Sequence, residues 1–452
     1  MGPLQVLDLS AAGFAAASPE QVSLPPGSVL ESFELLLGER TIWSGDAVVV
    51  HLSGERIGGR FTSGVLDLQH LRVGATLEGR MSLLREQSGQ LPAEWRATVG
   101  DLRQLLEDAR NEVEEFERAE MGDPLQRLDD EGRLFEGLLS NWGKDYYAAI
   151  ARLHAMSSGL DKRAVVLGRA YASSMLMPVL MACPMHRRAY EKPLGYAGDY
   201  RTIELYFTRE LVGDGLFGRF LHAVGQNYGL SHTVIAREGV ARAAVRAAAE
   251  ADGTGPVRVL ALAAGPAIEL RRWLDEMEPL RRPLELILLD QDRAAHETVH
   301  RHLTRILLER HRGASPVTVQ YLHSSVRQML KPVSPDDHRM VAETLADLDL
   351  VYSMGLYDYL PDPVAASLTR LLYSRLRAGG RLLVGNLVET PDTTWLMEYV
   401  LGWSLVYRTE ETLLHLADRL TPAPSQRGIT RDATGRCLFL DITSMGGALH
   451  PV

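Results

Sequence analysis

The sequence predicts a multidomain protein with β-structure at the N-terminus, helices in the middle and an α/β domain at the C-terminus. Three observations support this fold class. Short apolar runs broken by Gly, Pro and Ser occupy residues 1–85, which is typical of β-strands. Residues 121–235 have a mostly helical pattern, and from Gly239 onward apolar runs alternate with helical stretches. At 452 residues, the chain is long enough for two or three domains.

We expect four regions along the chain. Residues 1–86 would form the β domain, 87–120 a linker helix, 121–238 a helical cap and 239–452 the α/β domain. The linker is predicted by LRQLLEDARNEVEEFERA, where apolar residues recur at helical spacing in a charged background. The α/β domain would have a parallel sheet covered by helices on both faces. Its expected strands are 257–263, 284–290, 317–322, 349–353 and 381–386.

Composition narrows the function classes. The formal net charge of −10 argues against nucleic acid as the main partner. Only Cys183 and Cys437 are cysteines, and the histidines lack metal-ligand spacing, so we expect no disulfide framework and no metal site. The chain has no apolar run of membrane-spanning length, and its first ten residues lack the pattern of a signal peptide. We therefore expect a cytoplasmic protein.

Residues 257–270, VRVLALAAGPAIEL, predict a buried strand, a turn of small residues and a helix. Such a unit can bind a nucleotide, because small side chains let a ligand approach the backbone. The next strand ends at Asp290, with Asp292 close behind, roughly where a ribose-binding carboxylate belongs. One glycine followed by Pro266 suits a pyrophosphate poorly. It suits the amino-acid end of S-adenosylmethionine better, because that end has no phosphate.

The C-terminal domain resembles the class I S-adenosylmethionine-dependent methyltransferases, which are Rossmann-like. Three segments are similar to a bacterial subfamily associated with biosynthesis of the extracellular factor 3-hydroxypalmitic acid methyl ester: 184–207, 351–372 and 403–417. The resemblance implies that S-adenosylmethionine is the methyl donor. It also implies that the acceptor is the carboxylate of a small or fatty hydroxy acid. Such a carboxylate needs no general base at neutral pH.

The resemblance also implies a donor site. Glu269 would position the ammonium, or would be only a helix N-terminal acid. Asp290 or Asp292 would hold the ribose hydroxyls, and one of them would be a helix cap. Ser324 and Ser325 would lie near the adenine or act as N-caps. The expected donor-binding residues are Ala263, Gly265, Pro266, Glu269, Asp290, Asp292, Ser324, Ser325, Ser353, Met354, Gly355 and Tyr357.

The segment GYAGDY, residues 195–200, is the most unusual run in the chain. Its glycines suit a lid, and its aromatic rings and carboxylate are favourable near a sulfonium cation. We expect Tyr196, Asp199 and Tyr200 in the active site, with a tyrosine-rich structural turn as the alternative. Arg408 would clamp the acceptor carboxylate or form a surface ion pair.

Residues 8–13, DLSAAG, and the later IGGRF are similar to PilZ domains, β-barrels that bind cyclic di-GMP. The R-x-x-x-R half of the ligand motif normally precedes the aspartate, but no arginine precedes Asp8. Because those guanidinium groups bind the phosphates, we expect no tight binding of cyclic di-GMP. The domain would then serve docking or a homodimer.

Two rival functions remain at the level of sequence. The first is an O- or N-methyltransferase of a natural product or a signalling molecule. The second is a regulatory protein that binds the donor or a nucleotide without catalysis.

Overall fold

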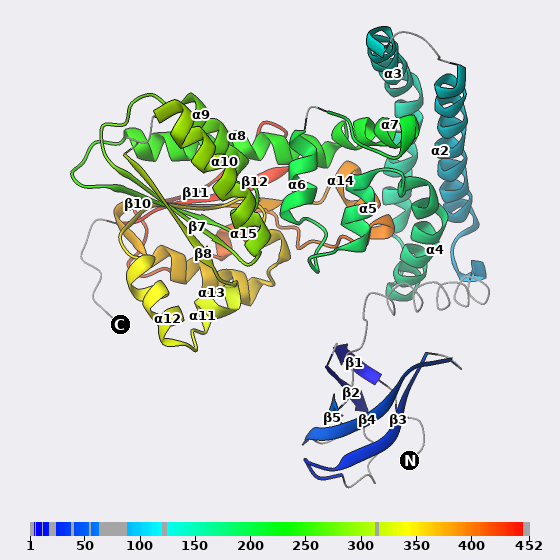
Figure 1. The fold of residues 1–452 in the computed structure, drawn as a ribbon, viewed down its shortest axis with the longest axis horizontal. Helices are drawn as coiled ribbons and strands as arrows, with labels where there is room; N and C mark the ends of the chain where they lie inside the picture. The colour runs from blue at the N-terminus through cyan, green and yellow to red at the C-terminus, as the bar shows by residue number, and fades with distance from the viewer. Residues whose placement is uncertain are drawn as a thin grey trace. The chain divides into compact units, whose positions relative to one another are not determined.

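A computed structural model describes residues 4, 6–10, 12–17, 24–37, 40–53, 56–62, 88–119, 124–208, 210–311 and 316–445. The chain divides into two compact units, Met1–Leu91 and Pro92–Val452 (Figure 1). Residues 63–87, which include the end of the expected β domain, and Ala11 of the PilZ-like motif lie outside the described residues, as does the side chain of Asp8.

The first unit is built on a five-stranded antiparallel sheet, and its core combines aliphatic side chains with stacked aromatic rings. The strand order is β1 (Val6–Ser10), β2 (Gly13–Ala17), β5 (Arg56–Phe61), β4 (Arg40–Ser53) and β3 (Val29–Leu37). The ring of Phe14 stacks on Phe33 with centroids 4.5 Å apart. Gly59 allows this packing, because a Cβ there would lie 2.4 Å from the ring of Phe14.

The second unit contains a seven-stranded sheet that is largely parallel. Its five parallel strands are β6 (Val257–Leu262), β7 (Leu284–Asp290), β8 (Val317–His323), β9 (Leu348–Ser353) and β10 (Leu376–Leu387), close to the expected ranges. The sheet order is β11-β12-β10-β9-β6-β7-β8. Strands β11 (Gln426–Arg431) and β12 (Cys437–Thr443) form an antiparallel hairpin beyond the expected strands. The order reverses between β6 and β9, the point where doubly wound sheets bind ligands.

Helices cover both faces of this sheet, as expected. Figure 1 shows α8 (Gly229–Glu250), α9 (Ile268–Glu276) and α10 (Arg293–His311) on one face. The other face is covered by α11 (Val326–Leu330), α12 (Pro335–Arg339) and α13 (Asp362–Tyr373). The short α15 (Glu410–His415) packs against β11 and β12.

The remaining helices form the other part of the second unit. They are α2 (Ala93–Ala119), α3 (Pro124–Ser157), α4 (Lys162–Leu180), α5 (Pro184–Glu191), α6 (Tyr200–Phe207), α7 (Gly215–Gln226) and α14 (Pro391–Trp395). The expected linker helix corresponds to α2, which buries an apolar face. The expected boundary at residue 238 falls inside α8.

Two tryptophans join the start of this helical part to the end of the chain. The indole N–H groups of Trp95 and Trp395 both donate to the hydroxyl of Ser157, at 2.9 and 3.1 Å. Both indoles are fully buried, and the ring of Tyr399 stacks on Trp395. Residues 395–399 therefore complete the core that α2 and α3 begin.

Candidate functional site

A cavity of about 590 Å³ lies at the carboxyl ends of the parallel strands. This volume is typical of a small-molecule site. Eleven of the sequence-predicted residues line it: Tyr196, Tyr200, Ala263, Gly265, Pro266, Glu269, Asp290, Ser324, Ser325, Met354 and Gly355. Five predicted residues are not among the lining residues: Asp199, Asp292, Ser353, Tyr357 and Arg408.

The turn after β6 has an unusual backbone. Ala263, Gly265 and Ala267 all have positive φ, at 53°, 52° and 46°. A Cβ on Gly265 would meet no heavy atom within 4 Å, so this position faces open space. The small side chains leave the backbone of the turn accessible to a ligand.

Asp290 ties this turn to the end of β7. Its Oδ2 accepts the backbone N–H of Gly265 at 2.8 Å, and its Oδ1 accepts the N–H of Asp292 at 2.9 Å. Burial raises the pKa of Asp290 above its ordinary value. A carboxylate oxygen can accept a second hydrogen bond, so both oxygens can still bind hydroxyl groups in the cavity.

Glu269 is a buried carboxylate in the cavity wall. Its Oε1 accepts a hydrogen bond from the hydroxyl of Tyr352 at 2.7 Å. Within the described part of the chain, no cation lies within ion-pair distance of Glu269. Burial raises its pKa to about 7, although the Tyr352 hydrogen bond opposes that rise. An uncompensated buried carboxylate favours a cationic ligand.

The two serines after β8 differ. Ser325 caps α11 in a capping box with Gln328, which agrees with the N-cap interpretation. The hydroxyl of Ser324 is buried and has no hydrogen-bond partner among the described residues. Ser324 is therefore the one available to a ligand.

The end of strand β9 and the loop after it contribute fewer residues to the cavity lining than expected. Ser353 is buried outside the cavity lining, whereas the adjacent Met354 and Gly355 line the cavity. Tyr357 is fully buried in the hydrophobic core, and its hydroxyl lies 3.1 Å from the hydroxyl of Thr369. Tyr357 therefore anchors the loop after β9 in the hydrophobic core.

The segment 195–200 covers the end of β7. The hydroxyl of Tyr196 donates a hydrogen bond to Asp292. Gly198 packs so closely that a Cβ would lie 2.5 Å from the hydroxyl of Tyr359 and 2.7 Å from the ring of Trp403. This close approach requires glycine at position 198. The contacts of Tyr196 and Gly198 hold the segment beside the cavity.

Asp199 has a structural environment. Its carboxylate is fully buried, accepts the N–H of Thr202 at 2.9 Å as the N-cap of α6, and pairs with Arg188 at 2.7 Å. These contacts direct Asp199 away from the cavity, whereas its neighbour Tyr200 lines it.

Arg408 is also directed away from the cavity, contrary to the carboxylate clamp that we expected. Its guanidinium is 1% exposed and binds the carboxylate of Asp362 at 2.7 Å. It also donates to the carbonyl oxygen of Tyr357 at 2.8 Å and to the side chain of Asn386 at 2.5 Å. Arg408 therefore fastens the loop after β9 to the end of β10.

The cavity instead contains a cation that the sequence did not single out. Arg237, on α8, lies in the wall with its side chain 11% exposed, 3.8 Å from the carboxylate of Asp358. No shorter contact satisfies its guanidinium among the described residues. Burial raises the pKa of Asp358 to about 6, which the charge of Arg237 opposes. Arg237 can therefore bind an anionic group of a ligand.

Among the residues that the structure describes, no group of three or more His, Cys, Asp and Glu side chains is arranged to hold a metal ion. Across the same residues, no helix has the length and apolar character needed to span a membrane.

Neither a protein-family model nor a curated protein matches the sequence. Among solved structures, the chain is similar to a possible exported protein from Bordetella parapertussis, at 15% identity and a TM-score of 0.41, covering 66% of this chain and 96% of that one. It is also similar to magnesium protoporphyrin IX methyltransferase from Synechocystis with bound S-adenosylhomocysteine, at 10% identity and a TM-score of 0.34 (48% and 86% covered). A third is the N-methyltransferase NodS from Bradyrhizobium japonicum, at 13% identity and a TM-score of 0.29 (46% and 86% covered). TM-scores this low carry no argument about function, which therefore depends on the site itself.

Proposed function

We propose that the second unit is an S-adenosylmethionine-dependent methyltransferase. The observation that carries the proposal is Glu269, a buried carboxylate that has no ion-pair partner among the described residues, in the wall of a cavity at the carboxyl ends of the strands. The donor carries an ammonium group and no phosphate, and it matches this charge and the single-glycine turn. The sheet order β8-β7-β6-β9-β10 supports the proposal, because it is the doubly wound order of nucleotide-binding folds.

The lining residues fit the donor part by part. Glu269 would hold the ammonium, Asp290 the ribose hydroxyls and the unpartnered hydroxyl of Ser324 the adenine. When bound, the donor supplies an electrophilic methyl group. The protein supplies alignment and a site from which water is excluded. The rings of Tyr196, Tyr200 and Trp403 line the cavity, and aromatic faces are favourable near a sulfonium.

We propose that the acceptor is a carboxylic acid with an apolar body. Arg237 is the cation available to its carboxylate. Leu230, Val234 and Leu405 provide apolar wall in the same cavity. The resemblance in residues 184–207 and 403–417 favours a fatty or hydroxy acid. No general base is needed, because a carboxylate is already ionised at neutral pH.

The experiment is a turnover screen of the full chain against fatty acids, hydroxy acids and small aromatic acids, with release of S-adenosylhomocysteine as the readout. A base-labile product methyl group would identify an ester, and a base-stable one would identify an ether or an amine. Donor binding without turnover on any acceptor would favour a regulatory protein. Absence of donor binding would contradict the proposal.

The role of the first unit is also a proposal. Its sequence is similar to PilZ domains but does not contain the arginine half of the ligand motif before Asp8. We propose that it serves docking or dimerisation rather than tight binding of cyclic di-GMP. Calorimetry with cyclic di-GMP would contradict this if the dissociation constant were below about 1 μM.

A further inference from the structure

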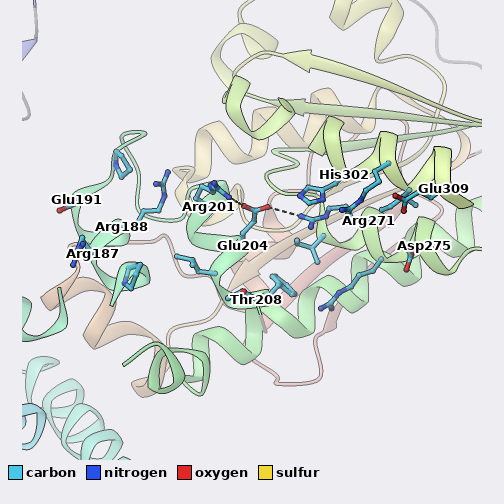
Figure 2. Close-up of a pocket in the computed structure, with 18 residues that line it drawn as sticks. Arg187, Arg188, Glu191, Arg201, Glu204, Thr208, Arg271, Asp275, His302 and Glu309 are labelled. Atoms are coloured by element: carbon cyan, nitrogen blue, oxygen red, sulfur yellow. Dashed lines mark hydrogen bonds and ion pairs between the residues drawn. The ribbon is translucent and has the colours of Figure 1, made fainter. Parts of the chain in front are cut away.

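We call the cavity of about 590 Å³ described above the donor cavity. A second cavity, of about 880 Å³, lies beside it and is lined mainly by charged residues (Figure 2). Four helices form it: α5, α6, α9 and α10. It shares only Phe207 and Ile268 with the donor cavity. We call it the arginine groove. Nothing in the proposed methyl transfer uses this groove.

Cations outnumber acids in the arginine groove. Six arginines and His302 line it, against four carboxylates. Figure 2 shows Arg201, Glu204 and Arg271 as neighbours, and the Glu204 carboxylate accepts from both guanidinium groups, at 2.9 and 3.3 Å. Asp275 is paired with Arg310 at 3.0 Å, an arginine that does not line the groove. Two of the acids are therefore in ion pairs, and Arg187, Arg188 and Arg272 pair with acids outside the groove. Arg305 is the groove arginine that has no ion pair with a described residue.

Two side chains on α10 have no polar partner among the described residues. Arg305 and His302 have neither a hydrogen bond nor an ion pair with any of the described residues. Burial, together with the charges of Arg305 and Arg272, lowers the pKa of Arg271. Burial and the charge of Arg271 lower the pKa of His302. Burial is the main cause of both pKa shifts and Glu204 opposes them, but the charges of neighbouring arginines add to each, and an anion in the groove would offset those charges.

The groove also has an apolar wall. Leu205 and Phe207 are half-buried and line the groove, beside Ile268 and Ile306, which are already nearly buried. A free inorganic anion would leave this wall in contact with water. An anion joined to an apolar group would cover it and gain the free energy of apolar burial.

We propose that the arginine groove binds a phosphomonoester that carries an apolar substituent. A phosphoryl group matches the groove better than a single carboxylate does, because it has three acceptor oxygens and close to two negative charges. Cations on separate helices, Arg271 on α9 and Arg305 on α10, can contact it together.

The test is calorimetric titration of the full chain with octyl phosphate below its micellar concentration, compared with octanol and inorganic phosphate. Octyl phosphate should bind more tightly than either half of the molecule alone. Arg305→Met should weaken this binding by about tenfold or more, because it removes an unpaired guanidinium. Arg301→Met is the matched control, since Arg301 is exposed on the same helix and outside the groove. It should change the affinity less than twofold, roughly.

Two results would overturn the proposal: no binding of octyl phosphate up to about 1 mM, or equal weakening by Arg305→Met and Arg301→Met. If inorganic phosphate bound as tightly as octyl phosphate, the proposed role of the apolar substituent would be wrong. Arg305 does not line the donor cavity, so S-adenosylhomocysteine should bind Arg305→Met as it binds the wild type. The arginine groove and the methyltransferase proposal can therefore fail separately.

Discussion

The hydroxyl of Tyr196 donates a hydrogen bond to the carboxylate of Asp292, two residues that lie 96 positions apart in the chain. Tyr196 belongs to the segment before α6, and Asp292 follows β7. The bond fastens this segment across the edge of the sheet, beside the cavity. Asp292, one of two candidates for the donor ribose, is thereby engaged with a side chain. Asp290, whose oxygens bind only backbone N–H groups, remains the candidate for the ribose.

Replacing Gly265 with valine should abolish donor binding. The valine side chain would occupy open space at the turn, and a β-branched residue is strained at a φ of 52°. Calorimetry with S-adenosylhomocysteine should show an affinity at least about tenfold lower than that of the wild type. Gly435→Val is the matched control, because Gly435 has a φ of 70°, faces open space and lies in the β11–β12 hairpin. Equal loss in both variants would mean that strain alone explains the effect.

Donor affinity should rise with pH through about 7, the raised pKa of Glu269 in the folded protein. Below this pH the buried carboxyl is protonated and cannot attract an ammonium. Glu269→Gln should bind S-adenosylhomocysteine weakly and should lose this pH dependence. Titrations between about pH 6 and pH 8.5 would measure it. Parallel profiles for the wild type and Glu269→Gln would contradict the role of Glu269.

The same carboxyl should affect stability in the absence of ligand. The folded protein binds its proton more tightly than the unfolded chain, whose pKa is near 4.5. The free energy of unfolding should therefore decrease as pH rises from about 4.5 to about 7. Glu269→Gln should remove this contribution, which denaturant titrations of both proteins across that range would measure. A steeper slope in the variant would be inconsistent with a raised pKa.

Asp199→Asn and Tyr200→Phe should separate structure from catalysis. Asp199 is buried, caps α6 and pairs with Arg188, so its amide variant should lose about 2 kcal/mol of stability and have a lower Tm. Tyr200 lines the cavity, and removing its hydroxyl should lower turnover with little change in Tm. Thermal scans and turnover assays on both variants would show the difference. The assignment is wrong if Asp199→Asn keeps the wild-type Tm.

Arg237→Met should raise the KM for a carboxylic acid acceptor by about tenfold or more, with a smaller loss of donor affinity, because the charge of Arg237 lowers the pKa of Glu269. Arg237→Lys should retain part of the effect, because it keeps the charge and loses the planar fork. Arg246→Met is a suitable control, since Arg246 is exposed on the same helix. An unchanged KM in Arg237→Met would remove the carboxylate anchor from the proposal.

The central strands β6, β7 and β9 could be predicted because each is buried on both faces and is therefore a continuous apolar run, such as LELILLD at β7. Gly265, Glu269 and Asp290 could be predicted because each lies at or just beyond the carboxyl end of such a strand. Arg237 could not, because only the packing of α8 against β6 and β9 brings it to the cavity. The place of Arg408 likewise depends on acceptors in the loop after β9, in β10 and at the start of α13, which converge only after folding.

The shared hydrogen bonds of Trp95 and Trp395 to Ser157 have a consequence for synthesis of the chain. A growing polypeptide emerges from the ribosome in sequence order, and domains generally fold as they emerge. Here α2 and α3 emerge long before Trp395 and Tyr399, which complete their core. The core around Trp95 is therefore closed only after those later residues have been made, although Tyr171 of α4 already packs near its indole.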